Sequence, residues 1–196
     1  MKHIQFLATL ALFLIPALSF AQRIRVVSGD LSVLNNIRNM NVQYDYSNMD
    51  VGNKTEKEYV DEKRNAYNKR EDGRGDKWAA EWVDDRGKRF EPAFENAFNS
   101  SSDIRIGNYP NAKYTLIFET IFTEPGFNVG VTRSNSYISA DVLIVETADS
   151  NHVIAKLTCD NSPGRSFWGT DFDTGARIQE AYAAAGARLA RFFRNY

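Results

Sequence analysis

The sequence has few of the residues that build metal sites, disulfides and nucleophilic catalytic centres. It contains one cysteine, two histidines and five prolines in 196 residues. One cysteine allows no intramolecular disulfide, and one cysteine with two histidines cannot alone complete a tetrahedral zinc site. Phosphate-binding patterns of the G-x-G-x-x-G or G-K-[ST] type are absent. We therefore expect no metal and no cofactor.

A large charge of one sign is also missing. The formal net charge is −1, which gives no electrostatic reason to expect nucleic-acid binding. The hydrophobic fraction of 43% and the aromatic fraction of 13% are too high for a disordered protein. The length indicates one domain that is large enough to bury a sizeable core.

Long apolar runs are confined to the first residues. Lys2 and His3 supply a short basic start, Phe6 to Phe20 is almost continuously apolar, and Ser19-Phe20-Ala21 has the small-x-small pattern that signal peptidase cuts. The run is shorter than the roughly 20 residues of a spanning helix, and Pro16 interrupts it. The sequence therefore predicts a cleaved signal peptide over residues 1–21 and an exported protein, either periplasmic or secreted.

The mature chain is predicted to be a single α/β domain over residues 22–196, with no transmembrane segment. Without residues 1–21 its net charge is −2, and it keeps His152 and Cys159 as its one histidine and one cysteine. An exported chain with one cysteine must hold its fold by core packing. That requirement fits a bacterial envelope better than a small disulfide-stapled secreted domain.

The charges are concentrated in residues 54–91, which hold 11 basic and 11 acidic residues with interleaved signs. This pattern predicts a solvated helix with i,i+4 ion pairs, followed by a loop around Gly73 and Gly75. The tripeptide Arg74-Gly75-Asp76 would lie in that loop. It matches an integrin-type motif, but a three-residue match is weak evidence of function.

Two sets of aromatic residues recur at helical spacing. Trp78 and Trp82 stand four residues apart and would share one helical face, and Phe90, Phe94 and Phe98 repeat the same spacing. We expect all five to belong to the core rather than to a ligand platform. If the indoles are instead exposed, Trp78, Trp82 and Trp168 are the candidate binding aromatics for a glycan or a host surface.

The second half of the chain reads as an antiparallel meander followed by a helix. Residues 113–123, 134–147 and 153–157 alternate as three strands, the first with apolar residues on both faces and hence expected to be covered on both sides. Residues 178–193 repeat apolar positions at 4-3-4-3 spacing, with Arg177, Arg188, Arg191 and Arg194 on the other side. The predicted fold is of the α+β type within the α/β class. It consists of a mixed sheet with a long C-terminal meander, packed against a charged N-terminal helical segment and a long amphipathic C-terminal helix.

No catalytic set emerges from these elements. A Cys-His pair would need His152 and Cys159, which lie seven residues apart on one extended strand and therefore point to opposite faces. The D-x-D sequence at Asp171 and Asp173 lacks the remaining residues of an EF-hand loop, and we interpret it as a loop whose acids cap the final helix. If the protein is an enzyme, its candidate catalytic acids are Glu119, Glu146, Asp171 and Asp173. Buried carboxylates of this kind can perform acid–base hydrolysis.

Four segments carry a resemblance that spans nearly the whole mature chain: VQYDYSNMDVG at 42–52, YTLIFETIFTEPGFNVGV at 114–131, ISADVLIVETADSNHVIAKL at 138–157 and RIQEAYAAAGARLARFF at 177–193. They resemble a family of exported proteins of Bacteroidetes-type bacteria that has no established activity. In topology the chain is also similar to the N-terminal domain of the Tol-system periplasmic protein and to the curli secretion lipoprotein. It lacks the lipobox cysteine of the latter, and fold-level analogy does not establish function.

The first functional hypothesis is therefore a non-enzymatic exported domain that binds another envelope component, either a protein or a glycan. The alternatives are a carboxylate-based hydrolase and a glycan-binding protein. The sequence leaves the oligomeric state open.

Overall fold

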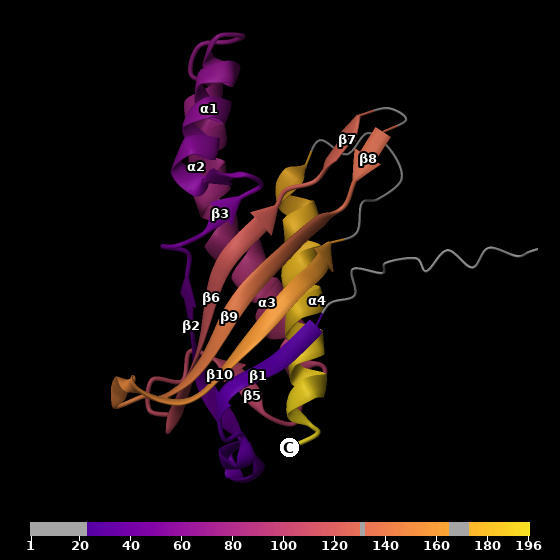
Figure 1. Ribbon diagram of the computed structural model, residues 1–196. Helices are drawn as coiled ribbons and strands as arrows, with labels where there is room; N and C mark the ends of the chain where they lie inside the picture. Colours follow the sequence, from indigo (N-terminus) through magenta and orange to yellow (C-terminus); the bar gives the residue numbers. More distant parts are fainter. Residues whose placement is uncertain (1–22, 130–131, 165–172) are drawn as a thin grey trace, which may run out of the picture.

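The computed structural model describes residues 23–129, 132–164 and 173–196. The predicted signal peptide over residues 1–21 lies outside these ranges, and so do Trp168 and Asp171. Within them the chain forms a mixed α+β fold in which helices pack on one side of a twisted sheet (Figure 1). The predicted fold class is confirmed.

A mixed sheet forms the centre of the molecule. Its strands follow one another across the sheet as β1 (Arg23–Gly29), β10 (Asp149–Gly164), β9 (Ser136–Glu146), β6 (Tyr114–Glu124), β2 (Asn39–Asp45) and β5 (Arg105–Gly107). The pairs from β1 to β6 are antiparallel, and β2 pairs in parallel with both β6 and β5. The predicted meander is thus β6, β9 and β10, and the parallel strands on one side make the sheet mixed.

Shorter elements complete the connections. A 3₁₀ helix, η1 (Ser32–Asn36), follows β1, and β3 (Asp50–Val51) pairs with β6 beyond the end of β2 and with β4 (Lys54–Thr55). Between β6 and β9 the chain forms a separate two-stranded ribbon of β7 (Phe127–Val129) and β8 (Thr132–Ser134). In Figure 1 this ribbon projects beyond the sheet.

The charged segment forms a helical hairpin that also projects beyond the sheet (Figure 1). Its arms are α1 (Glu56–Asn68) and α2 (Arg74–Asp85), and we call residues 56–85 the α1–α2 hairpin. Helix α1 begins in a capping box, in which Thr55 Oγ1 accepts the N–H of Glu58 at 3.3 Å and the Glu58 carboxylate accepts the N–H of Thr55 at 3.0 Å. This arrangement satisfies two donors at the start of the helix.

The tripeptide Arg74-Gly75-Asp76 does not lie in an exposed loop. It forms the first turn of α2, where Gly75 is buried and donates its N–H to Asn68 Oδ1 at 2.6 Å. A Cβ at this position would overlap the backbone oxygen of Arg64 on α1. The glycine therefore serves the close approach of the two arms. The predicted loop is present at Gly73, but the placement of residues 74–76 in it was wrong.

Helix α2 continues into the core without a break. A π-helical turn, η2 (Arg86–Phe90), joins it to α3 (Glu91–Asn99), and α3 runs beside α4 (Thr174–Phe193). The two helices are parallel, because Phe90 stacks on Tyr182 at 5.1 Å and Phe98 meets Phe193 at 5.8 Å between ring centroids. Trp82 and the three phenylalanines of this segment are buried, as expected, whereas Trp78 is half-buried.

The prediction that β6 is covered on both sides was wrong. Leu116 and Phe118 are fully buried on the side of α3 and α4, but Ile117 and Ile121 on the other side are only half-buried. Both helices lie behind the sheet in Figure 1, and no described helix covers its front. Antiparallel strands tolerate water on one side, so apolar residues on both faces did not require two covering layers.

The prediction that Arg177 lies on the exposed side of α4 was also wrong. It is 3% exposed, and its Nε donates to the backbone oxygen of Pro125 at 3.1 Å. Burial of a guanidinium requires such acceptors. Among the described residues, no helix has the length and apolar character needed to cross a membrane.

Candidate functional site

The structure does not bring the predicted acids together. Glu119 lies on the open face of β6, where Asn48 donates to it at 3.0 Å, and Glu146 at the end of β9 is 3.3 Å from His152. Asp173 caps α4 by accepting the N–H of Ala176 at 3.0 Å. The β6 residue that pairs with Glu146 lies five residues before Glu119, so Glu119 and Glu146 are about 17 Å apart along the sheet. The hydrolase hypothesis therefore has no supporting carboxylate pair among the residues described.

Of the candidate binding aromatics, Trp78 alone combines a described position with partial exposure. Its indole packs against Tyr59, Tyr67 and Trp82, with ring centroids 6.0, 5.7 and 5.7 Å away. Trp82 is 7% exposed and belongs to the core. This cluster gives the charged hairpin an apolar interior, because α1 and α2 bury their aromatic faces against each other.

Beside Trp78 the surface is hollowed into an open groove of about 780 Å³. Helix α2 and the π-helical turn form one wall, and the first residues of α4 form the other. We call this feature the α2–α4 groove. Its lining includes Tyr67, Trp78, Glu81, Arg89, Asp173 and Gly175.

The groove is charged but balanced. Four basic and four acidic side chains line it: Arg74, Lys77, Lys88, Arg89, Glu81, Asp84, Asp85 and Asp173. Most are paired along α2, with Lys88 at 2.6 Å from Asp84 and Lys77 at 3.8 Å from Glu81. The ion pairs lie on the solvent side, where each contributes little to stability.

Arg89 ties the two walls of the groove together. Its guanidinium lies 3.0 Å from Asp85 on α2 and 2.7 Å from Asp173 at the start of α4. Burial raises the pKa of Asp85. Burial also opposes ionisation of Asp173, but the hydrogen bonds from Arg89 and from the backbone of Ala176 outweigh it and lower the pKa of Asp173. Both carboxylates thus serve to position α4, and neither stands free as a general acid or base.

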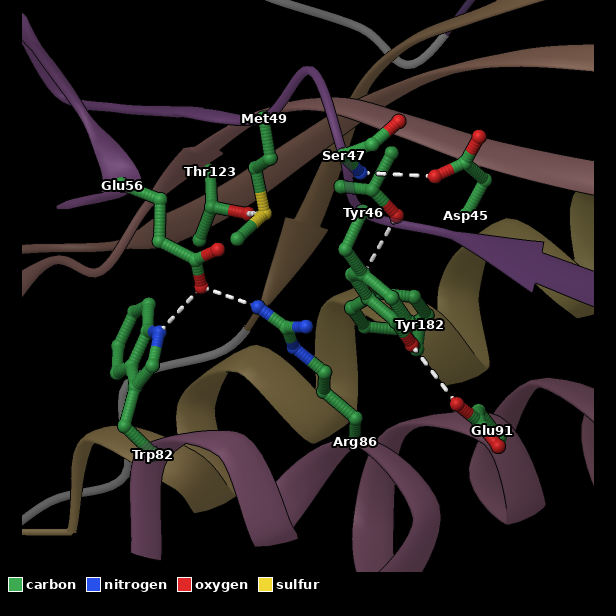
Figure 2. A network of polar contacts seen from close by, with 11 residues as sticks. Asp45, Tyr46, Ser47, Met49, Glu56, Trp82, Arg86, Glu91, Thr123 and Tyr182 are labelled. Carbon is green, nitrogen blue, oxygen red and sulfur yellow. Dashed lines mark hydrogen bonds and ion pairs between the residues drawn. The ribbon is translucent and has the colours of Figure 1, made fainter. Parts of the chain in front are cut away.

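A polar network lies at the base of the hairpin, where η2 meets the sheet (Figure 2). Glu56 at the start of α1 accepts a hydrogen bond from the Trp82 indole at 2.6 Å and another from Arg86. The Arg86 guanidinium lies over the Tyr46 ring, 4.3 Å from its centroid, and the Tyr46 hydroxyl donates to Glu91 at 3.3 Å. The network therefore connects α1, α2, α3 and the end of β2.

Tyr182 extends this network into the core. Its hydroxyl lies 2.6 Å from Thr120 Oγ1 on β6, and burial raises the pKa of both Tyr182 and Tyr46. A cavity of about 10 Å³ lies between Arg86 and Tyr182, and Arg86 Nε is buried with no hydrogen-bond partner among the residues that the structure describes. Single-turn π-helices are frequent at functional sites, and this one places Arg86 at the junction of hairpin and sheet.

Sequence reasoning missed both the groove and the network. Arg86, Tyr46 and Glu56 belong to stretches whose sequence predicts a solvated helix or a strand. The ion pair between Arg86 and Glu56 joins residues thirty positions apart. The one available signal was the unbroken helical spacing from Trp78 to Phe98, which indicates that α2 leads directly into the core helix. Within the described ranges, no group of three or more His, Cys, Asp or Glu residues could hold a metal ion.

A scan against protein-family models finds no match, and a search of curated proteins finds none either. Among solved structures the chain is similar to the PelC dodecamer from Paraburkholderia phytofirmans, with a TM-score of 0.40 and 13% identity over 86% of this chain and 97% of that chain. It is also similar to protein XCC0632 from Xanthomonas campestris, of the DUF330 family, with a TM-score of 0.37 and 18% identity over 53% of this chain and 58% of that one. At these TM-scores neither neighbour assigns a function, which must be inferred from the chain's own residues.

Proposed function

We propose that this protein is a non-enzymatic, exported domain of the bacterial cell envelope that binds another envelope component in the α2–α4 groove. The observation that carries the proposal is the groove itself. Its volume of about 780 Å³ lies within the range of ligand sites, and it combines an aromatic wall with several polar groups. A partner held there would contact Trp78 and the ion-paired side chains around it.

The state of the charged groups favours binding over catalysis. A general acid or base needs a titratable group that is free to reach the substrate. In the groove Asp85 and Asp173 are both engaged by Arg89, and Asp84 is engaged by Lys88. The groove therefore offers hydrogen-bonding and aromatic surface, which suits recognition.

The envelope location rests on two features of the sequence. Residues 1–21 have the basic start, apolar run and small-x-small end of a signal peptide. The four segments quoted above resemble an exported family of Bacteroidetes-type bacteria. Both features support a chain that works outside the cytoplasm.

A glycan is the second candidate for the partner, because Trp78 keeps part of its indole exposed in the groove. An aromatic ring with polar neighbours offers one apolar face and several hydrogen-bonding groups to a sugar. An envelope protein remains the first candidate, because the groove is open and lies against a projecting hairpin.

Site-directed photo-crosslinking in cells that produce the full chain tests the proposal. A photoreactive residue replaces Lys77 on the rim of the groove, and in a control it replaces Lys57 on α1, which is similarly exposed but lies outside the groove lining. We expect an adduct with an envelope protein or glycan from position 77 and none from position 57. No adduct, or the same adduct from both positions, would contradict the proposal.

A further inference from the structure

The last two turns of α4 carry a basic surface without acidic neighbours on the helix. After Glu180 the helix has no acidic residue, and Arg188, Arg191 and Arg194 follow at three-residue spacing. All three are exposed. None of them takes part in an ion pair with the rest of the described chain. We call these three residues the α4 arginine surface.

The acidic residues of the helices are concentrated away from this surface. On the α1–α2 hairpin and the π-helical turn many basic side chains lie beside acidic ones, as Lys57 does beside Asp61 and Lys88 beside Asp84, whereas Lys69 and Arg70 directly follow a helix with several acidic residues but pair with none of them. The full chain has a net charge of −1, so three uncompensated arginines on one helix form a local excess of positive charge. The field of such a patch attracts anionic partners.

The helix dipole accounts for the positions of two of these arginines but not for the third. A basic residue near a helix C-terminus interacts favourably with the helix dipole, and the effect falls off within the last turn. Arg191 is in the last turn of α4, and Arg194 follows at its C-cap. Arg188 lies before the last turn, so its position next to the other two is not explained by the dipole.

Aromatic side chains accompany the arginines. Phe192 is half-buried and packs on Tyr196 with 5.4 Å between ring centroids, and Tyr196 is 48% exposed. Tyrosine rings are enriched at the headgroup level of membranes, and basic side chains are attracted to anionic headgroups. Arginine also pairs with phosphate through two parallel hydrogen bonds, which lysine cannot do.

We infer that the α4 arginine surface docks on a membrane surface that contains anionic phospholipids. The geometry is compatible with the groove proposed above, from which this inference is independent. Seventeen residues of helix separate Thr174 from Arg191, which corresponds to about 25 Å. In Figure 1 the end of α4 lies away from the α1–α2 hairpin. Docking at this end would leave the α2–α4 groove free.

Vesicle sedimentation tests the inference. The protein is the chain from Gln22 onward, which contains every described helix and strand, and the probes are vesicles of phosphatidylcholine alone or with 30% phosphatidylglycerol. One variant carries Arg188, Arg191 and Arg194→Gln. The matched control carries Lys57, Lys69 and Arg70→Gln, which removes the same charge from the α1–α2 hairpin.

We expect the arginine variant to bind anionic vesicles about 100-fold more weakly at low ionic strength, since each basic residue near such a surface contributes about 1 kcal/mol. The control should lose a few-fold at most, and 0.5 M salt should weaken binding of the unaltered protein. Equal losses in the two variants, or salt-independent binding, would overturn the inference. Retention on an acidic polysaccharide without vesicle binding would overturn it as well. Because all six residues lie on the surface, thermal melts should show folded protein in both variants.

Discussion

The guanidinium of Arg86 lies 4.3 Å from the ring centroid of Tyr46 and pairs with Glu56, so one side chain joins the π-helical turn, the sheet and the hairpin. The side chains of Arg86 and Glu56 are 21% and 22% exposed. A pair that is largely shielded from water is sensitive to the loss of one partner, because the other keeps its desolvation cost. This junction holds the α1–α2 hairpin, and with it one wall of the α2–α4 groove.

Arg86→Met tests the junction. The substitution keeps an apolar side chain but leaves the Glu56 carboxylate without its cation, and we expect the free energy of unfolding to fall by about 3 kcal/mol. Urea denaturation measures it. Adding Glu56→Gln should recover part of the loss, because the amide still accepts from Trp82 without carrying a charge. An Arg86→Met protein as stable as the unaltered one would show that the network does not hold the hairpin.

Gly186→Ala tests the contact between α3 and α4. A Cβ at position 186 would overlap the backbone oxygen of Phe94, which cannot rotate away as a flexible side chain can. We expect a loss of about 2–3 kcal/mol from overpacking. Gly87→Ala is the matched control, since its Cβ would meet its nearest neighbour at 4.0 Å. The control should be neutral or slightly stabilising in the same melts.

The start of α4 depends on Asp173, which caps the helix and pairs with Arg89 across the groove. Asp173→Ala should lower stability by about 1–2 kcal/mol through loss of the cap. Asp173→Asn should lose less, because asparagine also caps helices but does not form the ion pair. Equal losses in the two variants, measured by urea denaturation, would show that the ion pair matters more than the cap.

The raised pKa of Glu95 predicts that the stability of the protein depends on pH. Burial raises its pKa above the ordinary value near 4.5, the neighbouring Glu91 adds to the shift, and the hydrogen bond from Tyr44 at 3.2 Å opposes it. The folded state therefore binds this proton more tightly than the unfolded state, so this contribution to stability falls as pH rises above the ordinary value. Glu95→Gln should be more stable than the unaltered protein at pH 7, and the difference should vanish at pH 4. A constant difference between these two pH values would contradict the assignment.

The elements that sequence reasoning predicted well are those with strong local periodicity. The spacing from Ile178 to Phe193 predicted α4, and the alternation in residues 113–157 predicted the meander. Their apolar faces must be buried whatever the tertiary arrangement, so the local pattern is sufficient to predict these elements.

The errors have a different cause, because they depend on neighbours distant in sequence. Arg177 is buried because the carbonyl of Pro125 lies beside it, and Gly75 is helical because it packs against α1. The groove and the Arg86 network likewise arise where α2 meets the start of α4 and the end of β2. No local pattern encodes these contacts.

Whether the α2–α4 groove holds the partner can be measured on the protein itself. The most direct measurement is the change in backbone amide chemical shifts when the partner captured from position 77 is added to the labelled protein. Binding in the groove should confine the shifts to residues 74–89 and 173–175, and the Trp78 indole signal should shift as well. Shifts centred instead on Ile117, Leu143 and the open face of the sheet would contradict it.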